Sequence, residues 1–397
     1  MGVPASDRRR VLHLIKSVMV VGGAERLLLS LTGAGDRQRF DYHVAHVLAD
    51  ASEYLTEELA SAGVTVHSLG VSSHYDLRWL LRLRALLIGE EIELVHLHLP
   101  YTAALGRLVV RSIPGGRRPR IVHTQHNIWQ HTSPAVRALH LATYRLDDAD
   151  IAVSQSVWAA LPRSLRSRTE VLVHGLPFGA LDDVPLARGD VRSEFGILPD
   201  EVLVATVANM RKEKGYEVLL EAARQLVDDG LPVRFVAVGH GPLEDEVRRA
   251  RDELGLRSRF ILTGFRNDAQ RVVAGSDLFV LASHHEGFPV AVMEALAAGV
   301  PVVSTAVGDV PQAVGESGGG LVVAAGDPAA LAEALRSLIL DPPRRLQMAE
   351  AARATGSNFD IRRASARLEE IYDALLSTGA RSSRLLRRDK PPATPGT

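Results

Sequence analysis

The sequence predicts an α/β protein of two doubly wound domains, each a parallel sheet covered by helices. Its 397 residues exceed what one hydrophobic core usually holds. Strand-like and helix-like segments alternate through the first half, and the alternation starts again near Val202 after a turn-rich boundary at 171–179. Such alternation is typical of parallel sheets with helical crossovers.

Short apolar segments mark the expected strands. In the first half they lie at 10–17, 42–48, 65–69, 94–98, 120–124 and 151–153, with helices from Ala24 and over 54–62 and 77–88. In the second half strands are predicted at 202–207, 233–238, 260–262, 277–282 and 300–304, and helices at 217–228, 329–338, 343–354 and 361–376. The polar residues 182–190 are predicted to form a linker.

The composition excludes several classes of protein. A net charge of −1 disfavours a general nucleic-acid binder, and the absence of cysteine excludes disulfides and cysteine-ligated zinc. The longest nearly apolar run, 289–308, contains Glu294 and is broken at Gly299 and Pro301, so it is not a transmembrane helix. The arginines at 8–10 precede a run interrupted by polar residues, which predicts a first strand in a cytoplasmic protein rather than a signal peptide.

The stretch 283–299 joins two predicted strands through one helix. Pro289 fits the first helical position, and Gly299 fits the helix end. Glu286 and Gly287 then lie in the loop at the carboxyl end of a strand, where the N-terminus of the helix suits a sugar or phosphate oxygen. Glu294 lies inside the helix and is placed to accept hydrogen bonds from neighbouring hydroxyls, as on a ribose. The alternative for Glu294 is a solvated surface residue.

Two further loops offer groups suited to phosphate. Gly22 and Gly23 stand at a strand-to-helix turn, where the backbone can approach a ligand, although any tight turn uses such a pair. Arg211 and Lys214 follow the strand at 202–207, where two cations can neutralise a diphosphate; a solvated loop remains the alternative. Glu244 occupies the position where a dinucleotide-binding fingerprint needs glycine, which argues against a dehydrogenase.

Histidines and acidic residues cluster near other predicted strands. His96 and His98 share one face of a strand, and His123 and His126 flank the end of the next. We expect no metal site, because no helical histidine pair with a glutamate accompanies them, and we expect His96 and His123 to be hydrogen-bonded. The acids of 148–150 precede a strand, opposite the end where α/β proteins bind ligands, and are assigned a structural role.

The spacing of Glu286 and Glu294, with seven residues between them, is the signature of the retaining, nucleotide-sugar-dependent glycosyltransferases of family 4. The chain resembles this family over about residues 10–376. The resemblance implies a GT-B fold, with two Rossmann-like domains facing a cleft. In this fold the last helix, at 359–378, crosses back to complete the first domain. The turn-rich boundary sets the first domain at 1–178 and the nucleotide-sugar-binding domain at 179–358. The basic residues 379–397, rich in Arg, Ser and Pro, are predicted to form a disordered tail.

The resemblance also assigns site residues. The catalytic positions are Arg211, Lys214, Glu286 and His126. The donor-binding positions are Gly22, Gly23, Gly239, Phe265, Arg266, Gly287, Phe288, Pro289 and Glu294. The acceptor-side positions are Glu25 and Asn127. The chain departs from the family pattern at His174, Asp309 and Gln312, which puts side-chain contacts carried over to these positions in doubt.

The implied reaction moves a sugar, with retention, from a nucleoside-diphosphate sugar to an acceptor hydroxyl in polysaccharide, glycolipid or other glycoconjugate biosynthesis. No metal or cofactor is required. The alternatives are a sugar-nucleotide epimerase or hydrolase of the same fold, and a non-catalytic nucleotide-sugar-binding protein. We expect no nucleic-acid partner, and the basic tail could contact the inner face of an anionic membrane.

Overall fold

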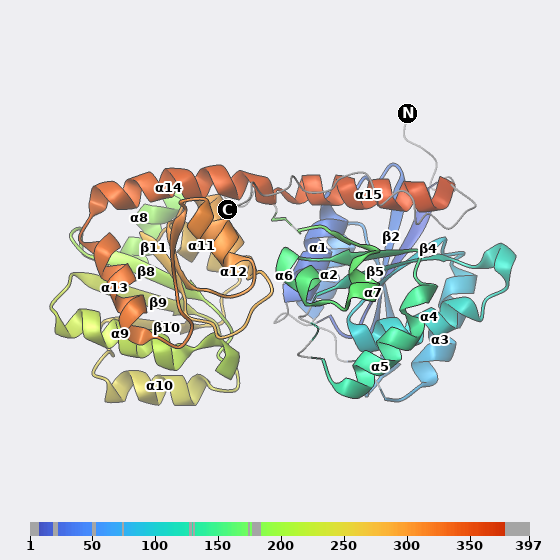
Figure 1. Cartoon of the computed structure of the whole chain (residues 1–397), viewed down its shortest axis with the longest axis horizontal. Helices are drawn as coiled ribbons and strands as arrows, with labels where there is room; N and C mark the ends of the chain where they lie inside the picture. The colour runs from blue at the N-terminus through green and yellow to red at the C-terminus, as the bar shows by residue number, and fades with distance from the viewer. Residues whose placement is uncertain are drawn as a thin grey trace. The chain divides into compact units, whose positions relative to one another are not determined.

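The computed structural model describes residues 8–18, 23–49, 53–73, 75–126, 129, 132–173, 175–176 and 184–377 (Figure 1). The described residues of Met1–His174 and Ile361–Thr397 form one compact unit, and those of Gly175–Asp360 form a second. The boundary between the two units thus falls between residues 174 and 175, whereas the sequence predicted it between 178 and 179. The predicted tail at 379–397 lies outside the described residues.

The first unit is built on a seven-stranded parallel sheet of order β3-β2-β1-β4-β5-β6-β7. Its strands are β1 (Arg9–Ile15), β2 (Phe40–Leu48), β3 (Thr65–Val71), β4 (Leu94–His98), β5 (Arg120–Gln125), β6 (Ala149–Ala152) and β7 (Thr169–Val171). Its α-helices are α1 (Gly23–Ala34), α2 (Glu53–Ser61), α3 (Arg78–Gly89), α4 (Pro100–Arg111), α5 (Pro134–Thr143), α6 (Gln155–Ala160), α7 (Arg163–Arg166) and α15 (Ile361–Ser377). Short 3₁₀ turns lie at Gly115–Arg117 and Tyr144–Leu146.

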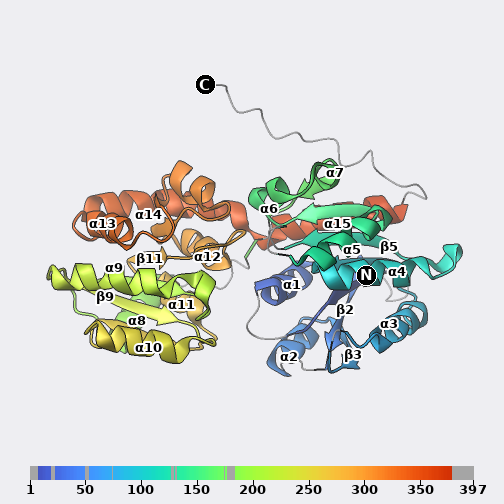
Figure 2. The ribbon, with the colours of Figure 1, turned by 60° about the horizontal axis from the view of Figure 1, so that its bottom comes forward.

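Alternating side chains of β1 pack on opposite faces of this sheet. Val11 and Ile15 join the core formed with α1, α2 and α15, whereas Leu12 and Leu14 join the core formed with α3 and α4. The last helix is tied to β2 because Tyr42 donates a hydrogen bond of 2.7 Å to Glu369. Helices therefore cover both faces, which explains why the strands are nearly continuous apolar runs (Figure 2).

The second unit is built on a six-stranded parallel sheet of order β10-β9-β8-β11-β12-β13. Its strands are β8 (Val202–Val207), β9 (Val233–Val238), β10 (Phe260–Gly264), β11 (Leu278–Leu281), β12 (Val302–Thr305) and β13 (Gly320–Val323). Its α-helices are α8 (Val184–Glu194), α9 (Tyr216–Asp228), α10 (Glu244–Glu253), α11 (Ala269–Ala274), α12 (Val290–Ala298), α13 (Pro328–Ile339) and α14 (Pro342–Gly356). Short 3₁₀ turns lie at Lys212–Lys214 and Ser357–Phe359, and a π-helical turn lies at Pro311–Glu316.

The strand order of the second unit fixes where a ligand can bind. Successive strands run outward from β8 to β10, and the chain then crosses to the other side of β8 to form β11. In open α/β sheets, ligands bind beyond the carboxyl ends of the strands at the point where the order reverses. In this unit that point lies between the loop after β8 and the loop after β11.

The predicted linker at 182–190 is wrong over its described part, because α8 begins at Val184. This helix is mostly polar, but Val191 is fully buried in a core with Leu203 and Val236. Arg192 also donates a hydrogen bond of 2.9 Å to the buried carboxylate of Asp277. The helix is therefore held by partners that lie far away in the sequence, and the local polarity misled the prediction.

Pro289 also differs slightly from expectation, since it is the N-cap of α12 with extended backbone angles rather than the first helical residue. Gly299 ends this helix, as predicted, and it adopts the left-handed conformation. Among the described residues, none of the helices combines the length and the apolar character needed to span a bilayer.

Candidate active site

Lys214 and Glu286 meet at the point where the strand order of the second unit reverses. Lys214 ends the short 3₁₀ turn after β8, and Glu286 lies in the loop after β11. The Lys214 ammonium donates a hydrogen bond to Oε1 of Glu286, and Ser283 donates a second one over 2.8 Å to the same oxygen. Both charged side chains are about four-fifths buried, with 20% and 14% exposed. The structure thus brings together two of the predicted catalytic residues.

Close backbone packing holds these two loops together. A Cβ added at Gly215 would lie 2.1 Å from the carbonyl oxygen of Ala282, so the approach requires glycine. The amide of His284 donates a hydrogen bond of 2.8 Å to the carbonyl oxygen of Glu213. The two loops that carry Lys214 and Glu286 are therefore packed and hydrogen-bonded to each other.

Arg211 lies on the same loop, three residues before Lys214. Its side chain is exposed, and no carboxylate of a described residue pairs with its guanidinium. The preceding residue, Met210, anchors the backbone of this loop. Met210 is fully buried, and its amide donates a hydrogen bond of 3.0 Å to the carbonyl oxygen of His240. An exposed cation on an anchored loop is available to an anionic ligand.

Glu294 is buried in α12, with 7% of its surface exposed. Its Oε1 accepts a hydrogen bond of 2.8 Å from the amide nitrogen of Gln270, which belongs to α11. A solvated surface role is excluded by this burial. A buried carboxylate needs such partners, and an acceptor-only group held here can receive hydrogen bonds from ligand hydroxyls.

The loops after β9 and β10 carry three predicted donor-binding residues. Gly239 has φ 147°, and a Cβ there would lie 2.0 Å from the carbonyl oxygen of Ala208. Phe265 is 43% exposed and meets His240 edge to face with ring centroids 5.6 Å apart. Arg266, in contrast, already pairs with Asp268 and Glu194, and these hydrogen bonds raise the pKa of its guanidinium. A contact between Arg266 and the donor stays a prediction, and these pairs compete with it.

The loop at 286–289 is braced by the loop after β12. The amide of Asp309 donates to the carbonyl oxygen of Gly287 over 3.0 Å, although Asp309 departs from the family pattern. A Cβ at Gly308 would lie 1.6 Å from the same oxygen, so only glycine permits this crossing. Phe288 packs on Phe359 with ring centroids 5.3 Å apart.

The predicted residue His126 belongs to the first unit, where it follows β5. Its Nε2 lies 2.9 Å from Nδ1 of His98 at the end of β4, so these two histidines are hydrogen-bonded. Gly23 and Glu25 lie in the first turn of α1. The other predicted residues of this region, Gly22 and Asn127, and the departure at His174 lie outside the described residues.

Two family models match the chain, one in each half. The model described as "Glycosyltransferase Family 4" matches residues 21–176, and the model described as "Glycosyl transferases group 1" matches residues 188–355. The chain belongs to glycosyltransferase family 4. Its two Rossmann-like sheets are those of the GT-B fold.

Curated relatives agree with the family assignment, and a solved structure agrees with the fold. The glycosyltransferase is 24% identical over 321 residues to N-acetyl-alpha-D-glucosaminyl L-malate synthase of Bacillus anthracis, covering 78% of this chain and 82% of that protein. It is 33% identical over 194 residues to D-inositol 3-phosphate glycosyltransferase of Corynebacterium aurimucosum, covering 47% of this chain and 46% of that protein. The crystal structure of Anabaena HepE in complex with UDP and glucose superposes with a TM-score of 0.81 at 22% identity, covering 92% of this chain and all of HepE.

A second buried polar group of the glycosyltransferase lies at the amino end of β6. Arg107 and Asp147, both fully buried, form an ion pair of 2.7 Å, and Asp150 pairs with Arg168 over 2.9 Å. Asp147, Asp150 and His123 lie within metal-binding distance of one another. The two arginines already neutralise the two carboxylates, so the group fits a structural network, as the sequence predicted for 148–150.

One histidine prediction is confirmed and another is wrong. His96 is hydrogen-bonded, since its Nδ1 and Nε2 each lie 2.6 Å from a hydroxyl oxygen, of Tyr372 and Thr124 respectively. His123 makes no hydrogen bond with a described residue; its nearest acidic neighbour, Asp150, is 3.7 Å away. Burial and the nearby charge of Arg107 lower the pKa of His123 to about 3, so this ring is neutral.

Sequence reasoning missed two residues that hold the predicted carboxylates. Ser283 binds Glu286, and Gln270 binds Glu294. Ser283 stands only three residues from its partner, so a local signal existed. Gln270 lies on another helix, and no spacing in the sequence indicates that α11 and α12 bring the two side chains together.

Proposed function

We propose that this glycosyltransferase is a retaining, metal-independent enzyme that transfers a sugar from a nucleoside-diphosphate sugar to an acceptor hydroxyl. The observation that carries the proposal is the hydrogen bond between Lys214 and Glu286 at the point where the strand order reverses, with the exposed Arg211 on the same loop as Lys214. The reaction breaks the bond between the sugar's anomeric carbon and the diphosphate and forms a bond to the acceptor oxygen. The diphosphate leaves with the bonding electrons and takes up the proton that the acceptor hydroxyl loses.

Arg211 and Lys214 would compensate the charge that develops on the leaving diphosphate. Fixed cations in a partly buried site stabilise such a charge more than water does, because they need no reorganisation during the reaction. The Lys214 ammonium is held by Glu286. A diphosphate that forms an ion pair with Lys214 would replace Glu286 as its partner. Glu286 would then accept hydrogen bonds from the donor sugar's hydroxyls.

Glu294 would hold the ribose of the donor. Its position in the second turn of α12 places a carboxylate in reach of a nucleoside whose diphosphate lies at the N-terminus of that helix. The backbone amides at Gly22 and Gly23 would approach the diphosphate, and Glu25, His126 and Asn127 the sugar and acceptor, as the family resemblance implies.

The relatives indicate where to begin the search for substrates. Two of them are named for small acceptors, L-malate and D-inositol 3-phosphate, and HepE was crystallised with UDP and glucose. We therefore propose UDP-sugars as the first donors to test, with small hydroxylated acids, sugar phosphates and lipid-linked sugars as acceptors. Participation in glycoconjugate biosynthesis is common to these candidates.

A donor screen followed by a transfer assay tests the proposal. Purified protein would be heated with UDP, GDP and ADP and their sugar conjugates, since a ligand bound at a hundredfold excess over its Kd stabilises the folded state by about 2.7 kcal/mol. The best donor would then be incubated with each acceptor class, and the anomeric configuration of donor and product compared by NMR. An inverted product, or loss of activity after chelation of divalent metals, would contradict the proposed mechanism.

The same assay separates the two alternative functions. An epimerase or hydrolase converts the donor without any acceptor, and a binding protein shows the thermal shift without turnover. The assignment to a transferase requires that product appears only when acceptor is present.

We also propose that the enzyme is cytoplasmic and that its tail at 379–397 contacts anionic membranes. Co-sedimentation with phosphatidylglycerol vesicles should fall when the chain ends at 378.

A further inference from the structure

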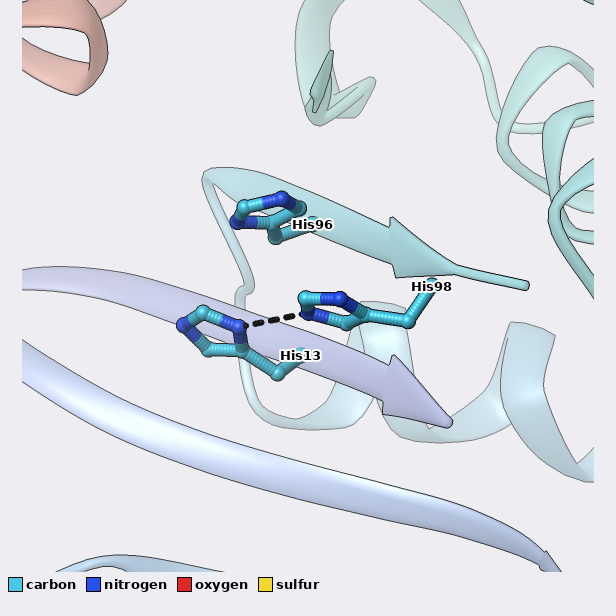
Figure 3. A group of neighbouring side chains, drawn as sticks. All are labelled: His13, His96 and His98. Carbon is cyan, nitrogen blue, oxygen red and sulfur yellow. Dashed lines mark hydrogen bonds between the residues drawn. The ribbon is translucent and has the colours of Figure 1, made fainter. Parts of the chain in front are cut away.

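Hydrogen bonds join three histidine rings of the first unit, those of His13, His98 and His126. Nδ1 of His13, in β1, lies 3.0 Å from Nε2 of His98, at the end of β4. Nδ1 of His98 lies 2.9 Å from Nε2 of His126. His13 and His98 are buried, and Figure 3 shows their rings directed toward each other from neighbouring strands.

The backbone around His98 is held in an unusual conformation. Leu99, the next residue, has φ 67° and ψ 136°, a left-handed conformation that costs a non-glycine residue about 1–3 kcal/mol. The hydroxyl of Thr102, in the first turn of α4, donates a hydrogen bond of 2.5 Å to the carbonyl oxygen of His98. The surrounding structure thus maintains this turn against its strain, which fixes the position of the His98 ring.

The chain of hydrogen bonds can run in only two directions. A neutral imidazole has one N–H donor and one acceptor nitrogen, so the choice at one ring sets the next. If His13 donates, each ring carries its proton on Nδ1, and Nε2 of His13 is a bare acceptor. If His126 donates, each ring carries its proton on Nε2, and the Nε2–H of His13 becomes a buried donor.

The environment of His13 selects the first direction. Its Nε2 is buried and has no hydrogen-bond partner among the described residues. Unpaired buried N–H groups are rare in native proteins, whereas unpaired acceptors are tolerated more often. Burial and the nearby charge of Arg37 lower the pKa of His13 to about 3, so this ring is neutral.

We propose that His98, anchored by His13, is a positioning residue that holds His126 in its Nδ1–H tautomer, so that His126 offers a hydrogen-bond donor to an oxygen of the donor sugar or acceptor. This inference rests on the proposed function, which supplies the sugar. A neutral His126 whose Nε2 accepts from His98 has no free lone pair for a general base. The residue therefore binds and orients the substrate and does not deprotonate it.

A metal site is the competing interpretation of the same cluster. Ring nitrogens of His13, His96 and His98 lie within 4.8 Å of one another, close enough to share an ion. However, both nitrogens of His96 are already bonded to hydroxyls, and both nitrogens of His98 are bonded to histidines. An ion would have to replace these hydrogen bonds, so the geometry favours the chain.

The tautomer of His126 can be measured directly. Long-range ¹H–¹⁵N correlation spectra of the full chain, labelled with ¹⁵N-histidine, distinguish Nδ1–H from Nε2–H rings, and His126→Gln identifies the signals of His126. We expect the Nδ1–H form near neutral pH. In His98→Leu the donor to His126 is lost, and His126 should change to the Nε2–H form that predominates for histidine in water. In His98→Asn the amide nitrogen replaces Nδ1 and should retain the native tautomer.

Sugar transfer provides the second measurement. We expect kcat/KM to fall about tenfold in His98→Leu, the equivalent of one hydrogen bond, and to recover in His98→Asn. An Nε2–H ring at His126 in the wild-type protein, or the same His126 spectrum in His98→Leu as in the wild type, would overturn the proposal. So would a stoichiometric metal ion in the purified protein. A wild-type protein that transfers no sugar would refute the proposed function, and the spectra would still decide the tautomer.

Discussion

Gln270 donates a hydrogen bond of 2.8 Å to Glu294, and so links α11 to the one carboxylate inside the apolar helix α12. If Glu294 holds the ribose, Glu294→Ala should weaken binding of the nucleoside-diphosphate donor about tenfold or more, because hydrogen bonds to charged groups contribute about 1.5–3 kcal/mol. Isothermal titration with the donor measures the change. Glu253→Ala, which removes an exposed carboxylate from α10, is the control and should bind normally. Equal affinities in the two variants would rule out the ribose contact.

Arg211 is expected to act on the rate more than on binding. Because the diphosphate gains charge as it leaves, Arg211→Ala should lower kcat about a hundredfold while KM for the donor changes little. The neighbouring Lys212 is also exposed and cationic, so Lys212→Ala makes the same change of charge outside the predicted site. Steady-state kinetics that show both variants at similar kcat would mean that Arg211 contributes only general charge.

The parts of this structure that the sequence predicted well are those that local pattern determines. The strands at 94–98, 202–207 and 233–238 are confirmed residue for residue, because a buried parallel strand is a short apolar run with turns at both ends. The same pattern placed Lys214 and Glu286 each at the carboxyl end of a strand. That these two strands are neighbours depends on the order of the sheet, which local sequence does not contain.

What could not be predicted rests on contacts between distant segments. The polar segment at 182–190 gives no sign of α8, because its stability comes from Asp277 and from the core around Val191. The partner of Glu294 lies 24 residues before it on another helix. His13 looked like an interruption of an apolar strand, and its bond to His98 becomes visible only when β1 and β4 pair.

Removing one partner of the buried Arg107–Asp147 ion pair should lower the free energy of unfolding more than replacing both partners with apolar residues. Arg107→Met leaves the Asp147 carboxylate buried without its cation, and we expect a loss of about 3–5 kcal/mol in the free energy of unfolding. The double variant with Asp147→Leu should recover much of that loss. Arg224→Met, which breaks an exposed pair with Asp228 on α9, should cost less than about 1 kcal/mol. Urea denaturation of the three proteins measures the differences, and a double variant less stable than Arg107→Met would contradict this account.

Buried neutral histidines should make the protein less stable in mild acid. The folded-state pKa values of His13 and His123 are lowered by burial to about 3, whereas an unfolded histidine titrates near 6.5. Between these values the unfolded chain binds more protons than the folded one, so stability present above about pH 6.5 is lost as the pH falls. Each such histidine contributes a slope of about 1.4 kcal/mol per pH unit.

The variant His13→Leu isolates one of these contributions. It removes one titrating group, so its free energy of unfolding should fall less steeply with decreasing pH than that of the wild type, whatever the offset between the two proteins. Urea denaturation over a series of pH values below neutrality compares the slopes. Parallel curves would show that His13 is not kept neutral by the fold.

A methyl group added at Gly308 should weaken donor binding, whereas one added at a matched glycine should affect stability alone. Its φ is +51°, and a Cβ would lie 1.6 Å from the carbonyl oxygen of Gly287, so Gly308→Ala must push apart the loops after β11 and β12. Gly318→Ala is the matched control, because its φ is +75° but its nearest neighbour would be an ordinary contact of 3.8 Å with Ala351. Both variants should lose about 1–2 kcal/mol from left-handed strain. Only Gly308→Ala should also lose donor binding, since the displaced loop carries Glu286 and Gly287. Titration calorimetry and thermal denaturation on both variants test this, and normal donor affinity in Gly308→Ala would place the donor away from this loop.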